Sequence, residues 1–334
     1  MSSKTKFKRH RFDKALISEI QKLHKLDNWH GIMMLLEDWI CIMGAIAASL
    51  WAWQNLPLSG AALTYLLSVL VIGAKQRGLR VINHMATHNA IAKNPQLNYI
   101  LSTVFAAWLV LESASGYDNT HNSLQNGHHP NLGTERDVDH KAIVEQGLYG
   151  EGCSPENVQQ FLWMIPFKTL GYITFLLKNR VWNPYEKSTE RVIRLSYLTV
   201  LLSVMLWAGL GMPVLLYWIV PLFTSAIWIG IIIQLAEHYP LMESNHEYDI
   251  YVSRNRILNP LINFFMGTHN EGYHLIHHLY PRLPLWQMKK AHQVLMADPI
   301  YNSLHHQTGV LHLFQQLIPT TNPPAIAELQ PVRE

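Results

Sequence analysis

The chain contains two pairs of long apolar runs, and a short turn joins the runs of each pair. Residues 39–56 and 61–83 are predominantly apolar and are separated by the uncharged turn PLSG. A second pair, 195–211 and 213–236, is interrupted by GLGMP, where glycine and proline favour a turn over a continuous helix. A helix that crosses a bilayer needs about 20 mostly apolar residues. The pattern therefore predicts an all-α integral membrane protein with two transmembrane helical hairpins.

The two ends of the chain are polar, and the first of them is basic. Positive charge next to a membrane helix indicates the cytoplasmic side, and the basic residues here are Lys4, Lys6, Lys8, Arg9, Arg11, Lys14, Lys22 and Lys25. We expect a basic cytoplasmic segment over 1–30, a membrane domain over 31–318 and a flexible tail over 319–334.

Composition agrees with this division. Of the 334 residues, 49% are apolar and only 15% are charged, and the net charge of +3 gives no reason to expect nucleic-acid binding. The two cysteines, Cys41 and Cys153, offer neither a disulfide framework nor a thiolate metal site.

Histidine is abundant, with 19 in the chain, and several lie where an apolar run ends. HMATH at 84–88 has the i,i+4 spacing that places two imidazoles on one helical face, where they can chelate one ion. In HLIHH at 274–278, the adjacent His277 and His278 point about 100° apart, which suits two ions. His238 directly follows the last apolar run. Ionisable groups at the ends of membrane helices are costly unless they serve a site, so these histidines predict a metal centre.

The stretch HNSLQNGHH at 121–129 leaves one ligand open. Its last two histidines are adjacent, but along a straight helix the first lies roughly 10 Å from them, too far to share an ion. Either the Asn126-Gly127 pair breaks the helix and lets His121 swing back, or Gln125 supplies an amide oxygen instead.

Two further apolar runs, 98–111 and 161–177, are shorter or carry a charge, Lys168. If the histidine clusters on either side of each run share one compartment, neither run can cross the bilayer once. We therefore expect both to form interfacial or buried amphipathic helices under a cytoplasmic cap.

Together these motifs resemble those of the integral-membrane di-iron desaturases and hydroxylases. That superfamily carries three histidine boxes, HxxxH, HxxHH or HxxxHH, and HxxHH, on the cytoplasmic side of two membrane hairpins. HMATH matches the first box and HLIHH the third, and NEGYHLIHHLYPRLPLWQMKKAH at 270–292 resembles the C-terminal signature. EHY at 237–239 is similar to a ligand-bearing motif of membrane alkane hydroxylases, and LGTERDVD at 132–139 to a segment that follows the second box. The resemblance covers roughly residues 39–295.

The resemblance implies a cytoplasmic helical cap that holds two Fe²⁺ ions through His84, His88, His121, His128, His129, His238, His274, His277 and His278. We favour His121 over Gln125 because iron prefers an imidazole to an amide oxygen. Met85 stands where the first box usually has an acidic residue. The orientation of the rings is therefore expected to depend on other carboxylates such as Asp137, Asp139, Glu237 or Glu271. We expect polar surface or outer-sphere positions, not ligation, for His140, His246 and His269.

The implied activity is O₂-dependent desaturation of a long-chain fatty acyl group. Hydroxylation of an acyl chain or an alkane on the same di-iron site is the near alternative. A histidine-rich metal transporter or a metal-dependent hydrolase is the alternative from another class. A transporter would place its metal ligands near the bilayer midplane, whereas these histidines lie at helix ends. A hydrolase needs a general base such as the glutamate of HExxH, a motif that this sequence lacks.

Electrons must come from another protein. The sequence has neither a glycine-rich nucleotide motif nor a cysteine cluster, so a soluble ferredoxin, rubredoxin or b-type cytochrome is implied. Such a donor would dock on basic residues such as Lys75, Arg77, Arg80, Lys289 and Lys290. Alternatively, these residues anchor the protein at the membrane interface. The acyl carrier, lipid, coenzyme A or carrier protein, stays open. Both termini and the metal site are expected in the cytoplasm.

Overall fold

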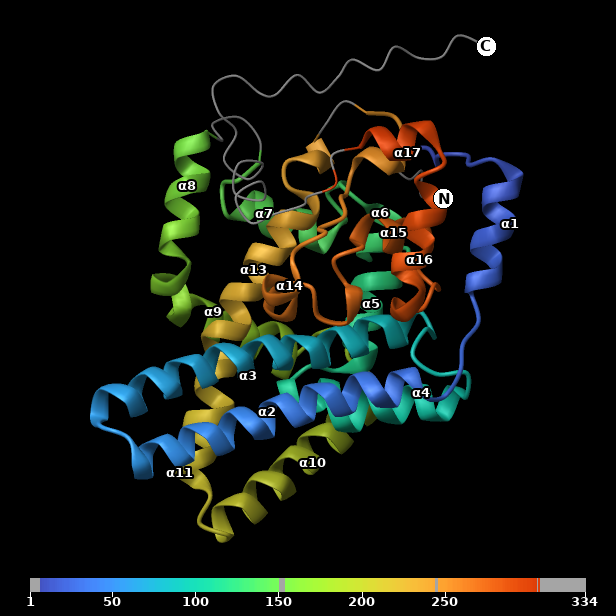
Figure 1. Ribbon diagram of the computed structural model, residues 1–334. Coiled ribbons are helices and arrows are strands. Elements are labelled where there is room, and N and C mark those ends of the chain that lie inside the picture. Colours follow the sequence, from blue (N-terminus) through green and yellow to red (C-terminus); the bar gives the residue numbers. More distant parts are fainter. Residues whose placement is uncertain (1–6, 150–153, 244–245, 305, 307–334) are drawn as a thin grey trace.

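The computed structural model describes residues 7–149, 154–243, 246–304 and 306. Within these ranges the regular elements are all helical, apart from an isolated bridge between Lys8 and Tyr248 (Figure 1). The all-α prediction is thereby confirmed for the described part of the chain. The predicted tail at 319–334 lies outside the described residues, and the division into three regions stays a prediction.

The first predicted hairpin consists of α2 (His30–Asn55) and α3 (Leu58–Thr87), which lie side by side (Figure 1). α2 begins nine residues before the predicted start and so contains Glu37 and Asp38. Asp38 is fully buried, and its carboxylate lies 2.8 Å from His269 Nε2 and 3.6 Å from Lys75 Nζ. Because these partners compensate the charge, the helix need not begin after it.

The second helix pair consists of α10 (Ser188–Trp207) and a bent helix over Gly211–His238. The bent helix comprises α11 (Gly211–Val214), the π-turn η5 (Leu215–Ile219), α12 (Val220–Phe223) and α13 (Ser225–His238). Figure 1 shows α10 and α11 meeting at the end of the molecule farthest from α17.

Three described helices are long and apolar enough to cross a membrane, namely His30–Asn55, Leu58–Thr87 and Gly211–His238. A fourth span results if Pro95–Val110 and Ala114–Asn122, which are bent by 96°, count as one. α10 is not among them because its first half carries Glu190, Arg191 and Arg194. The number of transmembrane hairpins therefore stays a prediction.

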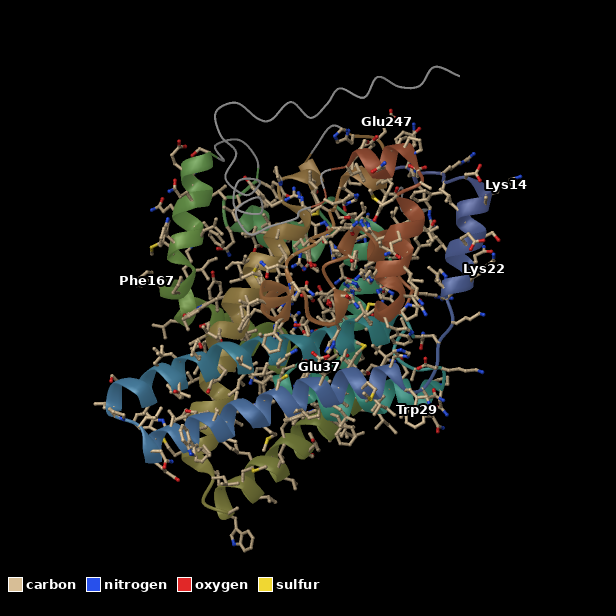
Figure 2. The ribbon with its side chains drawn as sticks, viewed as in Figure 1. Lys14, Lys22, Trp29, Glu37, Phe167 and Glu247 are labelled. Atoms are coloured by element: carbon tan, nitrogen blue, oxygen red, sulfur yellow. The ribbon has the colours of Figure 1, made fainter. Side chains whose placement is uncertain are left out.

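The two shorter apolar runs are helical. The first comprises α4 (Pro95–Ser102), η1 (Thr103–Ala107) and η2 (Trp108–Val110), which pack against α3. The second comprises α8 (Pro155–Met164), η3 (Ile165–Lys168), α9 (Thr169–Leu176) and η4 (Leu177–Val181). Trp163, Phe167 and Leu170 of the second run are 74%, 78% and 80% exposed, and Phe167 points away from the molecule (Figure 2). This apolar surface suits contact with lipid.

The remaining helices form a layer against one face of the α2–α3 hairpin (Figure 1). They are α1 (Lys14–Leu23), α5 (Ala114–Asn122), α6 (His128–Asn131), α7 (Val138–Glu145), α14 (Pro260–Met266), α15 (His274–Leu279), α16 (Leu285–Leu295), α17 (Pro299–Ser303) and the short turns η6 (Leu241–Glu243), η7 (Asp249–Tyr251) and η8 (Thr268–Asn270). Ile82 of α3, Leu275 of α15 and Met288 of α16 are fully buried in one core. This core fixes the end of α3 beside α15, and both elements carry histidine boxes.

Candidate metal centre

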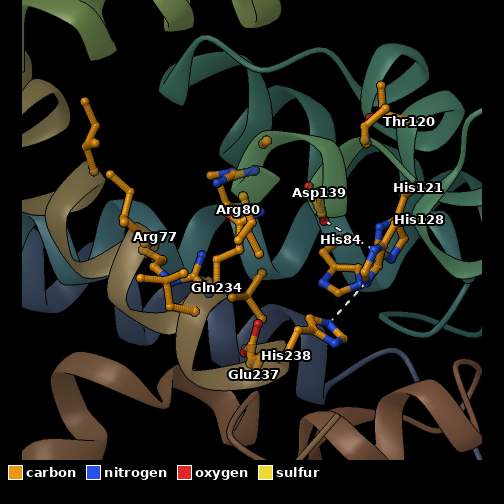
Figure 3. Close-up of a pocket in the computed structure, with 18 of the residues that line it drawn as sticks. Arg77, Arg80, His84, Thr120, His121, His128, Asp139, Gln234, Glu237 and His238 are labelled. Carbon is orange, nitrogen blue, oxygen red and sulfur yellow. Dashed lines mark hydrogen bonds and ion pairs between the residues drawn. The ribbon is translucent and has the colours of Figure 1, made fainter. Parts of the chain in front are cut away.

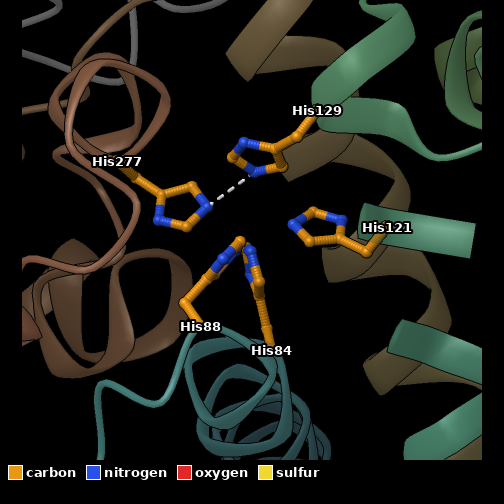
Figure 4. A group of neighbouring side chains, drawn as sticks. All are labelled: His84, His88, His121, His129 and His277. Atoms are coloured by element: carbon orange, nitrogen blue, oxygen red, sulfur yellow. Dashed lines mark hydrogen bonds between the residues drawn. The ribbon is translucent and has the colours of Figure 1, made fainter. Parts of the chain in front are cut away.

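The structure brings the nine predicted histidines together from five elements. They form two groups, and within each group one nitrogen atom of every imidazole lies within 4.8 Å of those of the others. The first group consists of His84, His88, His121, His129 and His277 (Figure 4). The second consists of His128, His238, His274 and His278. Adjacent residues of the second and third boxes are thus divided between the groups, as expected for side chains that point about 100° apart.

The first group contains buried ring nitrogens that have no hydrogen-bond partner among the described residues. These atoms are Nε2 of His84, His88 and His121 and Nδ1 of His277. His129 Nε2 lies 3.0 Å from His277 Nε2. Buried polar atoms without partners are costly, and one nitrogen of each of the five rings lies within 4.8 Å of the others, with His277 facing the group through Nε2 (Figure 4). This is the arrangement expected for ligands of an ion.

In the second group, the outer hydrogen bonds determine which nitrogens face one another. His238 Nδ1 lies 3.1 Å from the carbonyl oxygen of Val252, which can only accept, so Nδ1 carries the proton. His128 Nδ1 likewise donates to the Asp137 carboxylate at 2.9 Å. The two Nε2 atoms, 3.2 Å apart, then direct lone pairs at each other when both rings are neutral.

The other two rings of this group complete the same arrangement. His274 Nε2 lies 2.8 Å from His238 Nε2, and His278 Nε2 lies 3.2 Å from it. One proton cannot satisfy four converging nitrogens, whereas one metal cation can. The chemistry of this donor set therefore fits a transition-metal ion held by imidazoles.

The chain breaks between His121 and the adjacent pair of the second box. α5 ends at Asn122, the chain turns over Ser123–Gly127, and α6 begins at His128. A Cβ at Gly127 would lie 2.5 Å from both the backbone nitrogen and oxygen of Ser123, so the turn requires glycine there. His121 is buried in the first group, whereas Gln125 is exposed. This arrangement corresponds to the first alternative, in which Asn126-Gly127 breaks the helix and His121 turns back toward the adjacent pair.

Asp137 is the carboxylate that orients the second box. It is fully buried at the N-cap of α7 and accepts hydrogen bonds from the amides of Gly133 and Asp139, both at 2.9 Å. Burial alone would lower the pKa of His128, but the charge and hydrogen bond of Asp137 raise that pKa to about 9. Asp139 is more distant, at 3.6 Å from His128 Nδ1.

Glu237 has the corresponding position for the third box, at 3.6 Å from His274 Nδ1. It is held by Arg256, which is 1% exposed and donates to it at 2.7 Å. Glu271 contacts no histidine of either group; it binds Arg77 at 3.0 Å. Neither Arg256 nor the Val252 carbonyl could be identified from the sequence, where the available signal is the pair of arginines in YVSRNR, 251–256.

Apart from His128, the candidate ligands outside the membrane-spanning helices are kept neutral. Burial, reinforced by the neighbouring imidazoles, lowers the pKa well below its usual value for His129, His274, His277 and His278. Only neutral imidazole offers a lone pair to a metal, so the folded chain holds these rings in the form that can bind.

Three other histidines lie outside both groups. His269 has a side chain that is only 1% exposed, so it is not a surface residue, and it pairs with Asp38 across the hairpin. His140 is buried beside Tyr149, and His246 stacks on Tyr251. His269, Glu37 and Asp38 form a further group of side chains that could hold an ion, so the expectation that these three histidines are not ligands stays a prediction.

Two of the proposed docking residues, Lys75 and Arg77, are too buried to form a docking surface, and that interpretation is wrong for them. The side chain of Lys75 is 1% exposed and that of Arg77 is 13% exposed, and both are paired with carboxylates. Arg80 is paired with Glu112 at 3.2 Å. Lys289 and Lys290 of α16 are exposed, as a docking role requires.

A cavity of about 680 Å³ opens onto both groups (Figure 3). Its lining includes six of the nine histidines, His84, His121, His128, His238, His274 and His277. Apolar side chains from α9 and α13, including Phe175, Leu176 and Ile231, form another part of the wall. A substrate in this cavity would lie beside both groups.

Comparison with known proteins agrees with this geometry. Residues 59–309, which include all nine histidines, match the fatty acid desaturase family. The chain belongs to the fatty acid desaturase family. A relative, the dihydrorhizobitoxine desaturase of Bradyrhizobium elkanii, is 33% identical over 311 residues, which are 90% of this chain and 84% of that protein. This desaturase is therefore an oxidoreductase, and the resemblance inferred from the histidine boxes is confirmed.

Proposed function

We propose that this desaturase is an O₂-dependent, di-iron membrane enzyme that introduces a double bond into an aliphatic chain, such as a long-chain fatty acyl group. The observation that supports this most is the convergence of nine histidines into two groups on one cavity. One Fe²⁺ would be held by His84, His88, His121, His129 and His277, and a second by His128, His238, His274 and His278. When bound, the iron pair supplies the dioxygen chemistry that removes hydrogen from an unactivated C–H bond, which side chains alone cannot do.

The residues around the histidines prepare them for ligation. Asp137 and the Val252 carbonyl hold the Nδ1 protons of His128 and His238, so that the Nε2 lone pairs point to the centre of the group. Arg256 holds Glu237 next to His274. Fixed tautomers and ring orientations of this kind raise metal affinity and keep the two ions at defined positions.

The cavity wall binds the chain that is oxidised. Phe175, Leu176 and Ile231 present apolar surface, which binds methylene groups and excludes water from the reacting carbons. The choice between desaturation and hydroxylation depends on how these residues position the second C–H bond, because both reactions begin with the same hydrogen abstraction.

Product analysis tests the proposal. The full chain, expressed in a lipid-producing host or assayed in membranes with an electron donor, is expected to give a product that is two hydrogens lighter than the substrate. A product that gains one oxygen and loses no hydrogens would show a hydroxylase on the same centre. Product formation that continues without O₂ would exclude both and would favour the hydrolase alternative.

The topology and the electron donor belong to the same proposal. We place both termini and the metal centre in the cytoplasm, in accordance with the basic N-terminal segment. A soluble ferredoxin, rubredoxin or b-type cytochrome would dock over the exposed Lys289 and Lys290 of α16, which is packed against α15. Replacement of both lysines by glutamate is expected to raise the KM for the donor and to leave bound iron unchanged.

A further inference from the structure

Three arginines line the same cavity as the histidines. Arg77 and Arg80 lie on α3, on the face that carries His84, and Arg180 comes from η4 (Figure 3 labels Arg77 and Arg80). By helical rise, Arg80 and Arg77 precede His84 by roughly 6 Å and 10 Å along the axis. A purely apolar substrate gives no reason for guanidinium groups at this position, since buried cations are expensive.

Among the described residues, two carboxylates form ion pairs with the three arginines. Arg77 pairs with Glu271 at 3.0 Å, but Glu271 also lies 3.8 Å from Arg256. Arg80 and Arg180 share one carboxylate, that of Glu112, at 3.2 Å and 3.8 Å. Two carboxylates therefore form ion pairs with three cavity arginines, although Asp139 and Glu237 also line the cavity and act on Arg80 and Arg77 from a greater distance.

Two further observations show the unsatisfied positive charge. Arg77 Nε is buried and has no hydrogen-bond acceptor among the described residues. Burial, reinforced by the charge of Arg80, lowers the pKa of Arg180 to about 9, although Glu112 partly compensates. Glu112 therefore offsets only part of the cost of burying the Arg180 charge. An anionic group of a ligand in the cavity would supply the missing negative charge.

We propose that Arg77, Arg80 and Arg180 bind the carboxylate of the substrate, and that the substrate is a free aliphatic carboxylic acid. This inference rests on the proposed function, since it names the substrate class of the same cavity. A carboxylate suits guanidinium groups because both are planar and form paired, charge-assisted hydrogen bonds. The carbonyl of an ester or a thioester would leave the cluster without an anion.

The position of the arginines argues against a phosphate from a coenzyme or a lipid. The cluster lies within two helical turns of His84, so the anionic group that it binds is close to the carbons that react. The phosphates of an acyl coenzyme A or a phospholipid are separated from the acyl chain by many bonds. The new double bond is accordingly expected near the carboxyl end of the chain.

Binding of matched probes to the iron-loaded full chain in detergent tests the proposal. Calorimetry with dodecanoate and with methyl dodecanoate compares the same chain with and without the charge. We expect dodecanoate to bind about tenfold more tightly, as one charge-assisted hydrogen-bond pair implies. Equal affinities, tighter binding of the ester or of dodecanoyl coenzyme A, or no binding of dodecanoate would overturn the proposal.

Variants separate charge recognition from folding. Arg180→Gln is expected to weaken dodecanoate binding about tenfold and to leave ester binding unchanged. Lys178→Gln, an exposed neighbour on the same turn, is the matched control and should change neither. Glu112→Gln removes the shared carboxylate and should tighten dodecanoate binding. A loss of both probes in Glu112→Gln and Arg180→Gln alike would show that the arginines are structural and would contradict the proposal.

The same preparation distinguishes this inference from the proposed function. One outcome is a protein that binds two irons and forms an O₂-dependent double bond in an ester or thioester, without preference for the acid. This outcome would refute the carboxylate subsite and leave the proposed function intact. Carboxylate binding by a protein that holds no iron and forms no double bond would refute the proposed function and retain the subsite.

Discussion

Asp137→Asn is the substitution whose effect follows most directly from the described contacts. One carboxylate oxygen accepts from His128 Nδ1 at 2.9 Å and from the amide of Asp139, and the other accepts from the amide of Gly133. Asparagine keeps the size and one acceptor. Its amide NH₂ must face a donor at one of the two positions, and the bond to His128 loses its charge.

We expect Asp137→Asn to lower the affinity of the protein for iron. Loss of a hydrogen-bonded partner behind a ligating histidine typically lowers metal affinity 10- to 100-fold, or about 1.4–2.7 kcal/mol. We expect this loss in a titration of iron-loaded protein with a competing chelator. Thermal unfolding of the metal-free variant shows whether the fold is retained, since asparagine can still cap α7.

Asp139→Asn provides the matched control. Its carboxylate lies 3.6 Å from His128, and its side chain is 41% exposed, so solvent screens it. We expect its iron affinity to remain within a few-fold of that of the unchanged protein. If Asp137→Asn binds iron as tightly as the Asp139 variant, the assigned role of Asp137 is refuted.

Three further predictions concern the histidine groups. His121→Ala should lower bound iron, and Gln125→Ala, at an exposed position, should not; equal retention in both would show that neither is a ligand. Gly127→Ala should destabilise the second box and lower bound iron, because its Cβ would collide with the Ser123 backbone; an unchanged iron content would show that the turn tolerates a side chain. The metal-free protein should lose thermal stability as the pH falls below about 6.5, by about 1.4 kcal/mol per pH unit for each buried neutral imidazole, because the unfolded chain then binds protons that the folded chain excludes. A melting temperature that rises on acidification would contradict the lowered pKa values of His129, His274, His277 and His278.

Much of the metal centre could be predicted from local sequence spacing. His84 and His88 share a helical face, and the adjacent histidines of the second and third boxes diverge by a fixed angle. Both features depend on helix geometry alone. The resemblance to the membrane di-iron desaturases rested on the histidine boxes and the matching flanking segments, and comparison with known proteins shows the family.

The sequence left two candidates for the remaining ligand of the second box, His121 and Gln125, and could not decide between them. Asn126-Gly127 predicted a break, but where the broken chain goes depends on the contact of Gly127 with the Ser123 backbone. That contact is a property of the folded turn. Sequence spacing could not show that Gln125 would remain exposed.

Pairings between distant residues were the main source of error. Arg77 binds Glu271, 194 residues away, and the carboxylate of Asp38 meets His269, 231 residues away. In the sequence, Arg77 and Arg80 are basic residues at the end of an apolar run, and this pattern is the same for a buried ion pair and for a membrane anchor. Only the tertiary structure shows that these arginines face the cavity.

The number and identity of bound metal ions test the central claim most directly. Elemental analysis of the full chain, purified from membranes without added metal and compared with His121→Ala, gives both values. We predict about two irons per chain and a lower iron content in the variant. Zinc without iron, together with activity that persists in the absence of O₂, would contradict it.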